Sequence, residues 1–287
     1  MDYTNNLLCK NLTVNDGRLF FAGVDTVQLA EKYGTPLYVM DEERIRERCR
    51  CYTNAVNKVF GGRAEILYAS KAASFKRIYK IIAEEGMGAD VVSSGEIYTA
   101  RAAGFPLEKA YFHSNNKTDE DIAYAIDNSV GYFVTDNREE LEAVGSIASA
   151  KGKTQKILLR LTPGIDPHTY AAISTGKVDS KFGSAIETGQ AEEIARLALK
   201  TKGVELCGFH CHVGSQVFDS SVYLAAAEVM LDFIADFYAK TGYLAKKLDM
   251  GGGYGVRYTA ADPVIDIAAN IAEVVEFMLK RAASLGI

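Results

Sequence analysis

Short apolar segments alternate with amphipathic, helix-like segments along most of this chain. The early units recur about every 20 to 30 residues, which is the usual length of a strand followed by a helix. A series of such units builds a parallel sheet, and roughly eight strands favour a closed (β/α)8 TIM-type barrel over an open, doubly wound sheet. The predicted strands are Leu37–Met40, Ile66–Ser70, Gly88–Val92, Tyr111–His113, Tyr132–Thr135, Ile157–Leu161, Val204–Cys211 and Lys247–Met250.

The first 35 residues show a different pattern. The sequence Asn15-Asp16-Gly17 separates two apolar runs, as in a tight β-hairpin, and residues 25–33 then form a helical pattern that Gly34 closes. We therefore predict two parts: an N-terminal hairpin with a short helix over residues 1–35, and an α/β barrel over residues 36–287. Later helix starts are predicted at the capping residues Asp41, Ser74, Ser94, Thr118 and Asp262.

Composition excludes several classes of protein. The formal net charge of −5 and the pI near 5.5 argue against a nucleic-acid-binding protein. The chain has no run of about 18 apolar residues and no signal peptide at its first residues, so we expect no membrane partner. Five cysteines without a CxxC pair suit a reducing compartment, and we expect a cytoplasmic protein.

One lysine ends the apolar run at residues 66–70. Alternation along a strand places Leu67, Ala69 and Lys71 on one face. A lysine held at the end of a buried strand loses hydration, which favours the neutral amine. A neutral amine attacks carbonyl groups, so Lys71 is a candidate attachment point for an aldehyde cofactor. The alternative is a lysine that simply leaves the strand into solvent.

Two cysteines and two histidines crowd the segment from 207 to 212. Their types suit zinc, but on a strand His210 and His212 share one face while Cys207 and Cys211 point to the other, so one strand cannot surround a tetrahedral ion. We therefore expect no metal. Two interpretations stay open: buried histidines satisfied by hydrogen bonds, or imidazoles that project into a barrel mouth and contact a ligand.

Three consecutive glycines, Gly251, Gly252 and Gly253, follow the last predicted strand. Glycines let backbone N–H groups approach a ligand closely, and late loops of barrels are frequent phosphate sites. The segment matches neither a dinucleotide fingerprint nor a Walker loop. An ordinary tight turn is the alternative.

Charged residues at other strand ends could complete a site. Asp90 lies in an apolar strand and needs a positive partner, which Lys71 on the preceding strand could supply. Glu96 begins the next helix, where it supports the site or acts as a capping-box acid. Arg160 could serve the site or only form an ion pair. The long interval after Leu161, from 162 to 183, leaves the same end of a strand and is predicted to be functional.

These positions together suit one cofactor. A lysine, imidazoles, an acid, an arginine and a phosphate-type loop all fall at the carboxyl ends of successive strands. Pyridoxal 5′-phosphate carries an aldehyde, an aromatic ring and a phosphate, and would use all of them.

The motifs resemble those of the barrel-type, pyridoxal-phosphate-dependent amino-acid decarboxylases, whose barrel is alanine racemase-like. The resemblance runs from about Leu12 to the end, and within the family it is most similar to the diaminopimelate decarboxylases. The matching segments are Tyr68–Ala72, Asp90–Glu96, His113–Lys117, Ile173–Gly176, Ser180–Gly183, His210–Gln216 and Asp249–Gly253.

The resemblance implies a reaction and a set of roles. The reaction is decarboxylation of meso-2,6-diaminopimelate to L-lysine and CO2, the last step of lysine biosynthesis, in a homodimer. Lys71 would carry the cofactor and His212 would stack on its ring, both as catalytic residues. The remaining implied residues are Ser215, Gly251, Gly252 and Gly253 at the phosphate, Asp90 beside the cofactor, and Glu96, Arg160 and His210 in support.

The chain departs from the family pattern at its end. Family members continue into a strand ending in Glu-Pro-Gly-Arg and into a C-terminal β domain, and neither occurs in these 287 residues. Counted in the family's way, Leu37–Met40 lies outside the barrel and the last barrel strand is absent. We therefore expect an incomplete barrel and a chain that is not fully active alone. The alternatives are a decarboxylase of arginine, ornithine or carboxynorspermidine, or a non-catalytic barrel that binds the cofactor.

Overall fold

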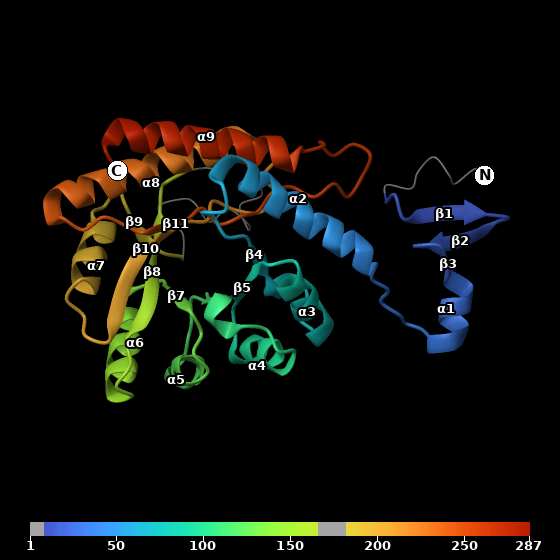
Figure 1. Ribbon diagram of the computed structural model, residues 1–287, viewed down its shortest axis with the longest axis horizontal. Coiled ribbons are helices and arrows are strands. Elements are labelled where there is room, and N and C mark those ends of the chain that lie inside the picture. The colour runs from blue at the N-terminus through green and yellow to red at the C-terminus, as the bar shows by residue number, and fades with distance from the viewer. Residues whose placement is uncertain (1–8, 166–181) are drawn as a thin grey trace.

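A curled sheet of parallel strands forms the centre of the molecule (Figure 1). The computed structural model describes residues 9–165 and 182–287. Within these residues seven strands pair in the order β11-β10-β8-β7-β6-β5-β4, and the short β9 (Ser184–Ala185) extends the end of β8. The bounds of the seven are β4 Leu67–Ala69, β5 Gly88–Val91, β6 Ala110–Phe112, β7 Tyr132–Thr135, β8 Gln155–Thr162, β10 Val204–His210 and β11 Lys247–Asp249.

Helices follow the strands and cover the outer face of the sheet (Figure 1). Buried apolar residues of the helices and of the outward-facing strand positions form one large core cluster between the two layers. Among the described residues, no helix is long and apolar enough to cross a membrane. The helices are α2 Glu42–Phe60, α3 Lys76–Glu84, α4 Ser94–Ala102, α5 Asp119–Asp127, α6 Arg138–Ala150, α7 Gln190–Ala198, α8 Ser220–Thr241 and α9 Ile267–Leu285.

Some predicted helix starts are confirmed and others are wrong. Asp41 caps α2, and Thr118 forms a capping box with α5. α4 is capped by Ser93, one residue before the predicted cap, and α3 begins after Phe75 without a side-chain cap. The cap of α9 is Asp266 rather than Asp262. Asp262 instead accepts backbone N–H bonds from the turn that precedes it, which uses up its carboxylate locally.

The sheet is an open half-barrel rather than a closed barrel. Strands β4 and β11 are its two edges, and within residues 9–165 and 182–287 no pairing joins them. The predicted strand Leu37–Met40 is wrong: this segment is extended but unpaired, and the Tyr38 side chain is 97% exposed. Its apolar pattern suits a strand, but no neighbouring strand lies beside it. Helices α2 and α9 pack together across the open side through a separate apolar cluster.

The N-terminal segment forms its own small sheet, at one side of the molecule (Figure 1). Strands β1 (Leu12–Asn15), β2 (Arg18–Phe21) and β3 (Val24–Asp25) are antiparallel, and helix α1 (Thr26–Tyr33) follows. The turn residues Asp16 and Gly17 both have positive φ, 50° and 75°, as a two-residue hairpin requires. The predicted hairpin and helix are confirmed, whereas the division of the chain at residue 35 stays a proposal.

Side chains on the inner, concave face of the sheet pack together near the amino ends of the strands. This inner cluster comprises Tyr111, Val134, Leu158 and Cys207, with partly buried Leu67 and Tyr132 against it. Cys207 was expected to point away from His210, and this expectation is wrong. A bulge between Leu206 and Gly208 shifts the alternation of β10, so both side chains lie on the inner face.

Candidate active site

The carboxyl ends of the strands carry ionisable side chains above the inner cluster. Because all seven strands are parallel, these ends meet at one edge of the curled sheet, which we call the mouth. Residues 166–181 of the predicted interval from 162 to 183 lie outside the described residues, and with them the motif at 173–176 and the first two residues of the motif at 180–183. The ionisable groups of the mouth are Lys71 after β4, Asp90 on β5, His113 after β6, Arg160 on β8, His210 on β10 and Asp249 on β11.

Glu96 fixes the turn that carries Lys71. Its Oε2 atom lies 2.6 Å from the Ser70 Oγ atom and accepts a 2.6 Å hydrogen bond from the Val92 backbone N–H. Ser70 Oγ also lies 2.7 Å from the carbonyl oxygen of Asp90. Only the Ser93 half of the expected capping box forms, since the Glu96 carboxylate is used for these longer-range bonds. Glu96 therefore ties the β4 and β5 ends together, directly before Lys71.

Lys71 lies at the mouth but is exposed. β4 ends at Ala69, and Lys71 belongs to the 3-10 turn Ser70–Ala72. The expectation that this lysine is dehydrated at the end of a buried strand is therefore wrong, because the turn lifts it off the strand into an open mouth. Its charge partly opposes the effect of burial on the pKa of Asp90, but these two described residues form no ion pair, so the predicted pairing stays a prediction. The amine is thus available to a ligand in the mouth.

Asp90 is a partly buried acid with unsatisfied bonding capacity. Burial raises the pKa of Asp90 to about 7, against the opposing charge of Lys71. Its Oδ1 atom has no hydrogen-bond partner in the described part of the chain, and the Nε2 atom of His113 lies 3.8 Å from it. An acid with a pKa near 7 can gain or lose a proton at neutral pH.

Three histidines of the described residues lie at the mouth, and burial keeps them neutral. The rings of His113 and His210 meet edge to face, with centroids 4.8 Å apart and planes at 74°. Burial lowers the pKa of both well below the ordinary value, and it lowers the pKa of His212 to about 3. His210 is 3% exposed, and its Nδ1 atom has no partner among the described residues. Neutral imidazoles are suited to stacking on a flat ring or accepting a hydrogen bond.

One set of groups in the mouth has the composition of a metal site. The ligand atoms of His113, His210 and Asp249 lie within 4.8 Å of one another. This set differs from the Cys207, His210, Cys211 and His212 set considered from the sequence. Asp249 also accepts a 2.8 Å hydrogen bond from the Gly251 N–H and so shapes the glycine turn. The expectation that no metal binds here stays an expectation.

Two loops lie side by side and form a cradle of backbone groups. The loop after β10 (212–217) and the glycine turn after β11 (251–256) exchange bonds: Val217 N–H donates to the Gly253 carbonyl, and Gly255 N–H donates to the Val217 carbonyl. The Gln216 side-chain amide also donates to and accepts from the Val256 backbone. This pairing sets His212, an exposed Ser215 and the glycine turn next to one another.

The glycines of the cradle are required by close backbone contacts. A Cβ atom at Gly253, where φ is +97°, would lie 1.9 Å from the Gly214 carbonyl oxygen, and one at Gly251 would lie 2.6 Å from the Cys211 carbonyl oxygen. Gly252 instead faces open space. An open, glycine-lined turn, together with the unpartnered atoms of Asp90 and His210, fits a ligand with a phosphate and a polar ring.

Arg160 supplies a buried positive charge to the mouth. Its guanidinium lies 4.3 Å from the centre of the Phe182 ring, and its Nε atom is 3.8 Å from Asp136 Oδ1. Its charge also acts on Asp90 and His212. The sequence left two alternatives for Arg160, an ion pair or a place in the site. In the structure Arg160 both pairs with Asp136 and lies in the mouth.

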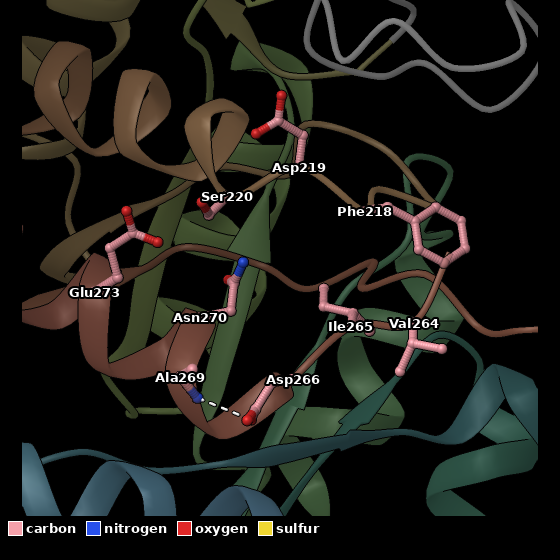
Figure 2. Close-up of a pocket in the computed structure, with 9 residues that line it drawn as sticks. All are labelled: Phe218, Asp219, Ser220, Val264, Ile265, Asp266, Ala269, Asn270 and Glu273. Atoms are coloured by element: carbon pink, nitrogen blue, oxygen red, sulfur yellow. Dashed lines mark hydrogen bonds between the residues drawn. The ribbon is translucent and has the colours of Figure 1, made fainter. Parts of the chain in front are cut away.

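A separate hollow lies outside the mouth, at the N-termini of α8 and α9 (Figure 2). It is open to solvent and has a volume of about 530 Å³. Asp266 caps α9 there by accepting the Ala269 N–H, and the amide of Asn270 lies between the two helix starts. None of the predicted site residues lines this hollow.

Comparison with known families decides what kind of mouth this is. A family model described as "Pyridoxal-dependent decarboxylase, pyridoxal binding domain" matches residues 42–287. The chain belongs to this family. The family description names a pyridoxal cofactor, and the mouth described above fits pyridoxal phosphate.

Relatives within the family share a more specific name. The chain is 43% identical to the diaminopimelate decarboxylase of Bacillus methanolicus over 268 residues, covering 93% of this chain and 62% of the relative. The enzyme of Bacillus subtilis is 40% identical, covering 94% and 61%. The structure of the M. jannaschii enzyme in complex with L-lysine matches with a TM-score of 0.81 at 31% identity, covering 96% and 63%. The chain thus spans about 62% of the length of such relatives.

Two residues of the mouth had no predicted role. His113 was seen only as part of a motif, and Asp249 only as the residue before the glycines. For Asp249, its position at the end of an apolar strand is the same signal that identified Asp90. For His113 the decisive fact is the contact with His210, which joins segments 97 residues apart and leaves no local pattern.

Proposed function

We propose that this chain is the cofactor-binding part of an enzyme that decarboxylates meso-2,6-diaminopimelate to L-lysine and CO2. One observation carries the proposal: the Lys71 amine stands at the same mouth as the neutral His212 imidazole and the glycine cradle. These three groups match the aldehyde, the ring and the phosphate of pyridoxal phosphate.

Each residue of the mouth has a distinct task in this proposal. When bound, pyridoxal phosphate supplies an aldehyde for covalent attachment and a ring that accepts the electrons left by departing CO2. Lys71 would hold the aldehyde carbon, and His212 would lie flat against the ring. Ser215 and the backbone N–H groups of 251–253 would hold the phosphate. Asp90, with a pKa of about 7, would hold the proton that Lys71 exchanges when the substrate amine replaces it.

The substrate assignment rests on the relatives. Diaminopimelate decarboxylases at 43% and 40% identity cover almost the whole of this chain, and a matching structure holds L-lysine. A lysine/ornithine decarboxylase of Vibrio vulnificus in complex with putrescine also matches, with a TM-score of 0.71 at 26% identity. This match keeps other basic amino acids as the second candidate class.

We also propose that the full-length enzyme is a cytoplasmic homodimer. Apolar side chains on the loop beside the glycine cradle support association, because Val256, Tyr258 and Val264 are 57%, 74% and 78% exposed. The boundary at residue 35 between an N-terminal part and the barrel part belongs to the same proposal.

Cofactor titration tests the proposed role of Lys71. Adding pyridoxal phosphate to the chain should produce the visible absorbance of the lysine-bound cofactor. Lys71→Ala should abolish it, whereas Lys76→Ala, an exposed lysine at the start of α3, should leave it unchanged. Absorbance that persists in Lys71→Ala would remove this lysine from its role.

Substrate displacement tests the chemistry of the ligand without requiring turnover. Titrating the cofactor-bound chain with candidate amino acids should shift the spectrum when the substrate amine replaces Lys71. We expect meso-diaminopimelate to act at a concentration at least about tenfold below that needed for ornithine or arginine, because about 1.4 kcal/mol of recognition gives that ratio. The reverse order would assign the enzyme to another basic amino acid.

A further inference from the structure

Lys117 is a charged side chain that the proposed function does not use. It lies in the loop between β6 and α5, and its side chain is 0% exposed. The Nζ atom donates three hydrogen bonds: to the Ser114 carbonyl at 2.8 Å, to the Val134 carbonyl at 2.8 Å and to Glu140 Oε1 at 2.6 Å. An ammonium has three N–H donors, so none remains for a cofactor or a substrate.

The partners of Lys117 belong to two successive strand–helix units. Val134 is on β7, and Glu140 is in the first turn of α6, whereas Ser114 follows β6. The second oxygen of Glu140 accepts the backbone N–H of Asp136, whose own carboxylate lies 3.8 Å from Arg160. Lys117 therefore joins the loop after β6 directly to β7 and α6, and through Glu140 and Asp136 this network reaches Arg160 on β8.

Ser114 has a backbone conformation that needs outside support. Its φ is +117°, a region that residues other than glycine rarely adopt. Ser114 directly follows His113, so this conformation sets where the chain turns after the histidine. The Lys117 bond to the Ser114 carbonyl holds that turn. His113 then lies 3.8 Å from Asp90 and edge to face with His210.

We propose that Lys117, paired with Glu140, is a positioning residue that holds the strained Ser114 turn and thereby fixes His113 beside Asp90 and His210 in the mouth. Lys117 acts through His113 and contacts no ligand. The inference rests on the proposed function in one respect: the cofactor that His113 would contact is the one proposed above. The contacts of Lys117, Ser114 and His113 do not depend on that function.

NMR titration of the His113 imidazole in the cofactor-free chain tests the proposal. The chain has four histidines, and His113→Gln assigns the signal. In the wild type His113 should stay neutral well below pH 6.5. In Lys117→Met the loop should relax and expose the ring, so that it titrates within about one unit of 6.5. The charged and titratable groups that face this ring are Asp90 on β5, Lys71 after β4, Arg160 on β8, His210 and His212 at β10, Asp249 on β11, and Lys117 itself.

Two further variants keep the test decisive. Lys117→Met leaves Glu140 buried without its partner, so Lys117→Met with Glu140→Gln removes the whole pair and should give the same His113 titration. Ser114→Gly removes the strain because glycine accepts positive φ. When Ser114→Gly is added to Lys117→Met or to the double variant, the titration of His113 should return to that of the wild type. Ser114→Gly alone should raise the unfolding midpoint. Lys151→Met, which breaks a surface ion pair with Asp127, is the matched control and should change nothing at His113.

Defined outcomes would overturn the inference. A folded Lys117→Met or double variant in which His113 still titrates as in the wild type would show that Lys117 only stabilises the fold. Failure of Ser114→Gly to restore His113, or a lower unfolding midpoint in Ser114→Gly alone, would remove the strained turn from the account. If His113 responds as expected but the chain forms no lysine-bound cofactor, the proposed function fails and the positioning role stands.

Discussion

The two ends of the parallel strands hold polar groups in opposite states. At the amino ends, the Tyr111 hydroxyl donates a 2.6 Å hydrogen bond to the Glu65 carboxylate. The Lys247 amine donates to the Tyr111 hydroxyl at 3.0 Å and to the Glu65 carboxylate at 3.2 Å. Burial raises the pKa of Glu65, but the bonds from Tyr111 and Lys247 outweigh it and the net pKa is lowered. At the mouth, Asp90 and His210 each have an atom without a partner among the described residues.

This difference separates a stabilising end from a functional end. Satisfied polar groups add modestly to stability, whereas unpartnered buried groups cost free energy that a bound ligand or an ordered water can offset. In parallel α/β barrels the carboxyl end is the end where loops converge and active sites form. The contrast within one sheet therefore identifies the mouth as the binding end, independently of any relative.

The largest expected effect is at the glycine cradle. Gly253→Val would place a side chain 1.9 Å from the Gly214 carbonyl at a φ of +97°, so we expect a loss of about 3 kcal/mol or more in unfolding free energy and no cofactor binding. Gly252→Ala is the control: its methyl group meets open space, so stability should change by less than about 1 kcal/mol while cofactor affinity falls. Denaturant unfolding and cofactor titration measure both. A stable, cofactor-binding Gly253→Val would contradict the cradle.

A smaller, pH-dependent effect is expected at Asp90. Its pKa rises from 3.8 unfolded to about 7 folded, so the unfolded state binds fewer protons between these values and folding loses stability as the pH rises through this window. Asp90→Asn removes this loss. The cofactor-free variant should equal the wild type near pH 4 and exceed it at pH 8 by on the order of a few kcal/mol.

Urea unfolding of Asp90→Asn at several pH values checks this sign. Neutral histidines at the mouth contribute in the other direction, with stability lost as the pH falls below 6.5, but they are present in both proteins and cancel in the difference. A variant that is less stable than the wild type at pH 8 would mean that Asp90 has a partner at the mouth.

The smallest effect is expected at the amino ends of the strands. Tyr111→Phe removes one hydroxyl that bonds Glu65 and Lys247, so unfolding free energy should fall by about 1 kcal/mol. Cofactor affinity should not change, because the hydroxyl is part of the satisfied cluster at the far end. A change in cofactor affinity comparable to that of Gly252→Ala would break the distinction between the two ends.

The regular part of the fold was predictable from local patterns. Short apolar runs bounded by capping residues located the strands of the sheet, and Thr118 with Asp121 marked a helix start that formed as predicted. Leu37–Met40 has the same apolar pattern but no neighbour to pair with. Whether a strand forms depends on such a neighbour, which is a long-range property that the local sequence does not contain.

The site was predictable in its residue types and less so in its geometry. Lys71, Asp90, Arg160 and His210 were located because polar residues at the ends of apolar strands are unusual. The hydration of Lys71 was predicted wrongly because it depends on what covers the mouth. The orientation of Cys207 was predicted wrongly because a single bulge reverses alternation and leaves no clear mark in the sequence.

Covalent capture of the cofactor tests the central claim most directly. The chain is mixed with pyridoxal phosphate and reduced with borohydride, which makes the link between lysine and cofactor permanent, and the modified peptide is identified by mass spectrometry. The account predicts that the phosphopyridoxyl group is on Lys71 in nearly all modified molecules. Modification spread over surface lysines, with Lys71 unmodified, would contradict it.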